Sequence, residues 1–167
     1  MILLETERLQ LRQFTLDDAP FTYELLNTPE WLKYIGDRKI TSVEVAAKYI
    51  EEHYLSEYKD NGYGAYIIVR KEDGVILGSC GLYKREALEH PDMGFAMFSR
   101  YGKKGYAFEA TNALMEHAKN TLKLSTIWGI TVDYNHNSIK LLQKLGMKQI
   151  DVINLKDDPE DLLLFST

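Results

Sequence analysis

The sequence predicts a mixed α/β (α+β) protein in which helices cover both faces of one mixed sheet. Hydrophobic residues recur at every second position in some segments and at every third or fourth position in others, and both kinds of segment occur along the chain. Three strand-like segments follow one another between residues 65 and 98 without an intervening helix. A doubly wound parallel sheet needs a regular alternation of strands and helices, so the sequence does not favour that fold.

The N-terminal part is expected to contain one strand and two helices. Leu9 and Leu11, followed by Phe14, stand against the polar residues Arg8, Gln10 and Arg12, and this period of two is typical of a half-buried strand. A helix is expected from Thr15 to about Asn27, because acidic residues follow Thr15 and favour a helix start. Thr41 and Glu44 then form a capping-box pattern, which opens a second helix.

The rest of the chain contains further strands and two more helices. The Asp73-Gly74 pair is a strong turn signal between two β-rich runs, and apolar residues from Ala110 to Leu122 recur at helical spacing. The expected elements, in chain order, are strands over 65–69, 75–82 and 93–98, a helix over 107–123, a strand over 125–132, a helix over 138–144 that ends at Gly146, and strands over 148–155 and 162–165.

Length and charge narrow the possible partners. The 167 residues predict a single domain, residues 1–167. Twenty Lys and Arg residues against 25 Asp and Glu residues give a net charge of −5, which argues against nucleic acid or an anionic membrane as partner. The lone cysteine, Cys80, has no partner for an internal disulfide, and neither a leader nor a membrane-spanning run is seen, so we expect a cytoplasmic protein. No residues have the spacing of metal ligands, and no metal is expected.

A glycine-rich turn joins the strand over 93–98 to the next helix. It contains Gly102, Lys103, Lys104 and Gly105. The first turn of a helix presents unpaired N–H groups, glycines allow a ligand to approach the backbone, and lysines add positive charge, so this turn suits a phosphate group. An ordinary connection with solvated lysines explains the same residues, and both interpretations stay open.

A second turn precedes the helix over 138–144. Capping explains its polar residues simply, with Asn137 as the N-cap and Asn135 stabilising the turn. Ser138 then lies at the start of the helix.

Together these segments resemble the GNAT superfamily of N-acetyltransferases. Gly105-Tyr106-Ala107 followed by Glu109-Ala110 is similar to the family's acetyl-CoA diphosphate loop, and Asn135-x-x-Ser138 with Leu141-Leu142-x-Lys144-Leu145-Gly146 is similar to its next motif. The segment from Thr6 to Arg12 resembles the opening strand of the ribosomal-protein-acetylating (Rim-type) branch. The resemblance implies a GNAT-type fold, with a mostly antiparallel central sheet flanked by helices on both faces.

The resemblance also implies a reaction, in which an acetyl group moves from acetyl-CoA, as cosubstrate, to a primary amine. A backbone N–H within Gly94–Phe98 would stabilise the oxyanion, and Ser138 would protonate the leaving thiolate. Asp92 is expected to accept the proton of the amine, directly or through water. The residues expected to contact acetyl-CoA are Phe95, Ala96, Met97, Phe98, Lys103, Lys104, Gly105, Tyr106, Ala107, Asn135 and Ser138.

Several of these side chains have a second interpretation. Asp92 also suits a turn at a strand start. Trp31 and Tyr34 fall where the family forms part of its acceptor pocket, although core or surface packing explains them as well. Glu109 is expected to be a structural carboxylate at a helix start. The two histidines beside the motifs are candidate bases or solvated surface residues: His90 and His136.

The acceptor is left open by the sequence. The Rim-type resemblance favours a protein N-terminus. A small-molecule amine, such as an amino acid, a polyamine or a drug, is an alternative. A non-catalytic acyl-CoA-binding sensor is another, because Lys103 replaces a family glycine and Leu142 stands where many members have a tyrosine. Either a monomer or a homodimer is compatible with the sequence.

Overall fold

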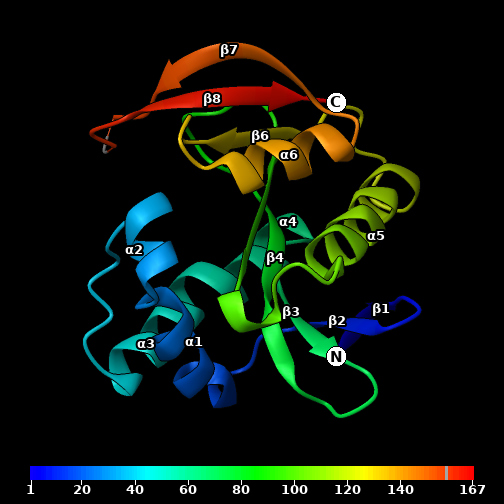
Figure 1. Ribbon diagram of the computed structural model, residues 1–167. Coiled ribbons are helices and arrows are strands. Elements are labelled where there is room, and N and C mark those ends of the chain that lie inside the picture. Colours follow the sequence, from blue (N-terminus) through cyan, green and yellow to red (C-terminus); the bar gives the residue numbers. More distant parts are fainter. Residues whose placement is uncertain (157) are drawn as a thin grey trace.

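A computed structural model describes residues 1–156 and 158–167 and confirms the mixed α/β fold (Figure 1). Eight strands form one sheet in the order β1-β2-β3-β4-β5-β6-β8-β7. Neighbouring strands are antiparallel except β5 and β6, which are parallel, so the sheet is mostly antiparallel as expected. The strands are β1 Ile2–Glu5, β2 Leu9–Gln13, β3 Ala65–Arg70, β4 Ile76–Tyr83, β5 Asp92–Met97, β6 Trp128–Thr131, β7 Lys148–Asn154 and β8 Asp161–Ser166.

Helices cover both faces of this sheet. Figure 1 shows α1, α2 and α3 grouped apart from α5 and α6. The helices are α1 Ala19–Leu26, α2 Pro29–Tyr34, α3 Val43–Ile50, α4 Ser56–Asn61, α5 Tyr106–Asn120 and α6 His136–Lys144. A π-helical turn over Glu51–Leu55 joins α3 to α4. Within residues 1–156 and 158–167, no helix is both long enough and apolar enough to cross a membrane.

Two hydrophobic clusters fill the space between the sheet and its helices. Ile67 of β3 packs with residues of α1 and α3, and its neighbour Ile68 packs with residues of α5 and α6. Successive side chains of a strand point to opposite faces, so β3 contributes to both layers. Cys80 is fully buried in the α5 layer, and burial raises its pKa to about 12.

Some element boundaries differ from the expectation. Strand β1 and helices α2 and α4 were not expected, and β6 is shorter than the predicted strand over 125–132. The cap of α3 is Ser42 and not Thr41, because the Ser42 hydroxyl accepts the N–H of Val45 at 3.1 Å. The cap of α6 is Asn135 and not Asn137. By contrast, Gly146 has a φ of +87° directly after α6, where a C-terminal glycine was expected.

Candidate active site

Helix α5 begins without a side-chain cap. Gly105 is its N-cap, with a left-handed φ of +79°, and no side chain of the described residues accepts a hydrogen bond from the first N–H groups of the helix. The N–H of Glu109 donates to the Gly105 carbonyl at 3.0 Å. The N–H groups of Tyr106, Ala107 and Phe108 therefore have no acceptor within the helix. A helix end of this kind is a favourable position for a phosphate group.

The turn before α5 is exposed, and one of its two lysines has an unusual backbone. Lys103 has a φ of +63°, a left-handed conformation that glycine adopts more readily. Lys104 is exposed like Lys103 and is not among the residues with positive φ. The backbone at position 103 thus has a conformation typical of glycine, although the residue is a lysine.

Strands β5 and β6 pair at one end only. Asp92 and Trp128 begin the two strands and form their one register pair within the described residues. Both strands then run in the same direction, and no later pair joins them in that part of the chain. The strands therefore part toward their C-terminal ends, and the end of β5 leads directly into the turn before α5.

Backbone donors of β5 point toward this opening. The N–H of Phe98 donates to the Leu77 carbonyl on the β4 side at 3.1 Å. Because successive N–H groups of a strand point to opposite edges, those of Phe95 and Met97 point to the edge that faces β6. These two groups lie within the segment where an oxyanion donor is expected.

The loop after β6 brings Asn135 and Ser138 to the same end of the sheet. The Asn135 side chain accepts the N–H of Ser138 at 3.3 Å, which caps α6, and Ser138 is 8% exposed. Leu142 packs against Gly129 of β6, where any added Cβ would lie 2.8 Å from a Leu142 methyl carbon. Leu142 is therefore a packing residue that holds α6 on β6.

An uncapped helix end, two parting parallel strands and a capped second helix therefore lie at the same end of the sheet. A family model described as an acetyltransferase (GNAT) domain matches residues 8–148. The chain belongs to the GNAT acetyltransferase family.

Relatives and solved structures agree with this assignment. The chain is 28% identical over 148 residues to an uncharacterised N-acetyltransferase, p20, of Bacillus licheniformis, covering 87% of this chain and 82% of the relative. It is similar to an acetyltransferase structure from Agrobacterium tumefaciens, with a TM-score of 0.82, 26% identity, and coverage of 98% of this chain and 92% of that one. It shares its fold with RimL, a ribosomal L7/L12 alpha-N-protein acetyltransferase in complex with coenzyme A, with a TM-score of 0.82, 16% identity, and coverage of 100% and 97%.

Among the expected catalytic residues of this GNAT protein, Asp92 lies at the closed end of the two strands. It is 1% exposed, and Arg85 donates to its carboxylate through Nε at 2.8 Å. Burial raises the pKa of Asp92, and the charge of Arg85 opposes that rise. Met97 lies five residues further along β5, about 16 Å at the usual rise per residue. Asp92 has the contacts of a structural ion pair, and its role as the base stays a prediction.

Helix α2 carries both residues expected at the acceptor side, but one is buried in the core and the other is partly exposed. Trp31 is buried in the core with α1 and α3, as its packing interpretation expects, and its indole N–H has no hydrogen-bond partner in the described chain. Tyr34 lies at the end of α2, with its ring centroid 5.8 Å from that of Tyr134. The Tyr134 hydroxyl donates to Glu160 at 2.7 Å, and this contact raises the Tyr134 pKa to about 12.

Sequence reasoning did not find this contact between three elements. Tyr134 follows β6, Glu160 precedes β8, and Tyr34 ends α2. The carboxyl ends of β6 and α2 thus meet beside the opening between β5 and β6. A cavity of about 360 Å³ adjoins the contact of Tyr134 with Glu160 and is lined by Asp133, Tyr134, Val152, Glu160, Asp161 and Leu163.

The other titratable candidates are two histidines and one carboxylate, and their surroundings are those of packing, surface and hydrogen-bonded residues. The ring of His90 lies edge-on to Trp128, with centroids 4.9 Å apart. His136 begins α6 on its exposed side. Glu109 is bound to Thr6 and Arg8, in agreement with a structural carboxylate. In the part of the chain that the structure describes, no three His, Cys, Asp or Glu side chains gather closely enough to hold a metal ion.

Proposed function

We propose that this protein transfers an acetyl group from acetyl-CoA to a primary amine, with a protein N-terminus as the acceptor. The uncapped N-terminal end of α5, beside the parting of β5 and β6, carries the proposal for the donor. The resemblance of Thr6–Arg12 to the Rim-type opening strand and the shared fold with RimL support the acceptor.

Each part of the site would have a defined task. The N–H groups of Tyr106, Ala107 and Phe108 would bind the donor's diphosphate, together with Lys103 and Lys104. The donor's thioester arm would lie along β5 in the opening, so that an N–H of Phe95 or Met97 stabilises the oxyanion.

The chemistry balances with the groups of this chain. A new bond forms between the amine nitrogen and the acetyl carbon, and the bond from that carbon to sulfur breaks. The amine gives up a proton, for which Asp92 is the predicted acceptor through water, and the departing thiolate takes a proton from Ser138. Asp92 releases its proton to water and Ser138 regains a proton from water, so the protein returns to its starting state.

The first experiment is a calorimetric titration with acetyl-CoA, with adenosine diphosphate as the control ligand, followed by a transfer assay on peptides and small amines. We expect micromolar binding of acetyl-CoA, weaker binding of the control, and acetylated peptide N-termini. Ser138→Ala should lower kcat by about tenfold to a hundredfold with little change in the Kd for acetyl-CoA. Asp92→Asn should lower kcat in a folded protein if Asp92 is the base.

Other outcomes would replace parts of this proposal. Turnover of small amines without turnover of peptides would assign a small-molecule acceptor. Tight binding of acetyl-CoA without turnover on any amine would assign a sensor. If acetyl-CoA does not bind, the proposed donor is wrong.

A further inference from the structure

We propose that Arg8 binds a phosphate group of the donor, through the terminal amino groups of its guanidinium. This inference rests on the proposed function, because it assumes that acetyl-CoA binds at the start of α5. Arg8 directly precedes β2, 97 residues before Gly105 in sequence, and no motif of the sequence assigned it to the donor.

Arg8 is held at the start of α5 by Glu109. The Glu109 carboxylate accepts the Arg8 Nε–H at 2.8 Å and the Arg8 backbone N–H at 3.0 Å, and it also accepts the Thr6 hydroxyl. Burial alone would raise the Glu109 pKa, but these hydrogen bonds and the positive charge of Arg8 together lower it. Glu109 is therefore ionised near neutral pH, and it fixes the direction of the Arg8 side chain.

Glu109 accepts a hydrogen bond from only one nitrogen of the Arg8 guanidinium, Nε. The contacts of Arg8 with Glu109 run through Nε and the backbone, and no hydrogen bond to Nη1 or Nη2 occurs among residues 1–156 and 158–167. The Nη2 atom lies 3.4 Å from the place that a Cβ on Gly105 would occupy, so it borders the N-cap of α5. The guanidinium carbon lies 4.3 Å from the centroid of the Tyr106 ring.

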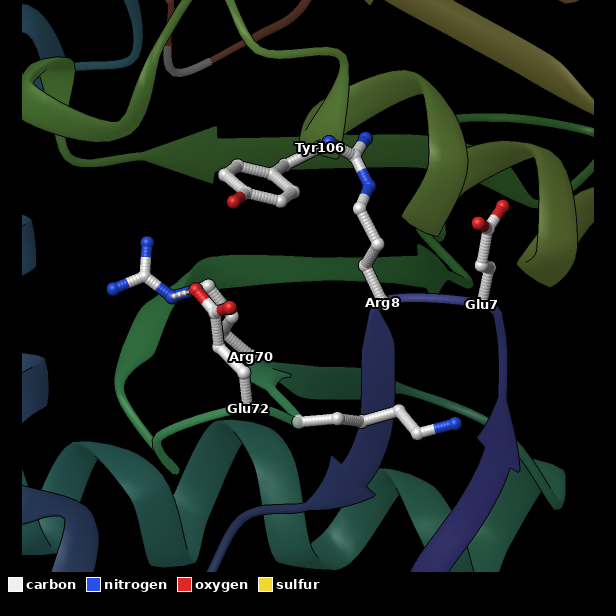
Figure 2. Close-up of a pocket in the computed structure, with 6 residues that line it drawn as sticks. Glu7, Arg8, Arg70, Glu72 and Tyr106 are labelled. Atoms are coloured by element: carbon white, nitrogen blue, oxygen red, sulfur yellow. Dashed lines mark ion pairs between the residues drawn. The ribbon is translucent and has the colours of Figure 1, made fainter.

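These free donors face a cavity. A hollow of about 390 Å³ is lined by Glu7, Arg8, Arg70, Lys71, Glu72 and Tyr106. Figure 2 shows Arg8 extending from the bend before β2 toward the beginning of the helix that carries Tyr106, with Arg70 across the cavity. The cavity therefore adjoins the helix end where the proposed diphosphate would lie.

Arg8 is the cation of this cavity that is best placed for a phosphate. Arg70 is bound to Asp73, with Nη2 to Oδ2 at 2.6 Å, and is 3.5 Å from Glu72. Lys71 donates to the Thr6 carbonyl at 3.0 Å. The carboxylates of Glu7 and Glu72 also line the cavity, so its net charge is small. Recognition must then come from directed N–H groups, which a guanidinium presents as a rigid fork.

The test compares the Kd of acetyl-CoA with that of its 3′-dephospho analogue, by calorimetry, in wild type, Arg8→Gln and Arg8→Lys. We expect Arg8→Gln to weaken binding of acetyl-CoA by about tenfold or more, as for the loss of a charge-assisted hydrogen bond. Arg8→Lys should also weaken it, because one ammonium cannot serve both Glu109 and a phosphate. A loss confined to acetyl-CoA identifies the 3′-phosphate as the bound group, and an equal loss for both ligands identifies the diphosphate.

Two matched controls separate binding from other roles of Arg8. Arg70→Gln removes the same charge from the same cavity and should change the Kd by less than about threefold, because Asp73 already occupies that guanidinium. Glu109→Gln removes the anchor and keeps the guanidinium, and it should weaken binding less than Arg8→Gln does.

The inference is overturned if Arg8→Gln or Arg8→Lys binds acetyl-CoA within twofold of wild type. It is also overturned if Arg70→Gln is equally harmful, since only net charge would then matter, or if Glu109→Gln is equally harmful, since Arg8 would then act only by holding α5. Absence of acetyl-CoA binding by the wild type is a different result, because it removes the proposed function itself.

Discussion

At the scale of single residues, Lys103 shows a local conflict between side chain and backbone. Its φ of +63° lies in the left-handed region, where a residue with a Cβ is less stable by about 1–2 kcal/mol. The turn continues into Gly105, which has a φ of +79° and meets no such cost. The turn before α5 therefore holds Lys103 in a backbone conformation that a lysine disfavours.

Lys103→Gly should stabilise the protein. The relief of the left-handed conformation exceeds the added entropy of the unfolded chain, so we expect the free energy of unfolding to rise by about 0.5–1 kcal/mol. Urea unfolding measures this change. Lys104→Gly is the matched control, because Lys104 has no positive φ, and it should lower the free energy of unfolding. Equal destabilisation by both substitutions would show that the backbone of Lys103 is not strained.

At the scale of elements, the chain enters α1 through a network centred on Asp18. Arg12 of β2 donates to both oxygens of the Asp18 carboxylate, at 2.8 and 2.9 Å, and the Thr15 N–H donates to it at 2.8 Å. The Asp18 carboxylate is 7% exposed. Burial alone would raise its pKa, but the hydrogen bonds from Arg12 and Thr15 lower it below the usual value. This network joins the end of β2 to the first helix.

The lowered pKa of Asp18 predicts a pH-dependent contribution to stability. A carboxyl group whose pKa is lower in the folded state stabilises the protein above its unfolded pKa, about 4, and this contribution is lost as the pH falls through the folded pKa. We therefore expect Asp18→Asn to lower the free energy of unfolding by about 1–2 kcal/mol at pH 7. The difference from wild type should shrink below pH 4.

Urea unfolding at several pH values between 2 and 7 tests this expectation. Asp17→Asn removes the same charge from an exposed neighbour and serves as the control. A difference between wild type and Asp18→Asn that stays constant across this pH range would contradict the assignment of the network to an ionised Asp18.

At the scale of the whole molecule, the sheet has a weak seam between β5 and β6. The antiparallel pairs on either side have several register positions, whereas β5 and β6 have the Asp92–Trp128 pair alone in the described residues. Across the seam, Tyr134 contacts α2 through the Tyr34 ring. A donor bound in the opening would contact elements on both sides of this seam.

Acetyl-CoA should therefore stabilise the fold as a whole. At a concentration of 100 times its Kd, a ligand of the folded state adds about 2.7 kcal/mol to the free energy of unfolding, so the Tm should rise. Hydrogen exchange should slow in β5 and the start of α5 and also in β6 and α6. Adenosine diphosphate, which lacks the thioester arm, should protect the start of α5 alone. Protection by acetyl-CoA that is confined to α5 would contradict binding in the opening between the strands.

The sequence by itself determined the local elements and the order of the motifs. The alternation around Leu9 and Leu11, the turn at Asp73-Gly74 and the glycine after α6 all depend on neighbours close in the chain, and each predicted its element correctly. The glycine-rich turn likewise predicted a strand, a turn and a helix start. The misplaced caps of α3 and α6 are also local, because two adjacent or nearby polar residues competed for one position and only the packing of each helix selects between them.

Only the tertiary structure decided which distant residues meet. Arg8 and Glu109 are 101 positions apart, and Tyr134 and Glu160 are 26 apart, so no periodicity in the sequence relates them. The ion pair of Asp92 with Arg85 also depends on the strand pairing, which buries Asp92 at the closed end of the seam, whereas Arg85 stays partly exposed. Hydrophobic patterning specifies which face of each element is buried, whereas the register and crossing of the elements specify which polar groups share a site.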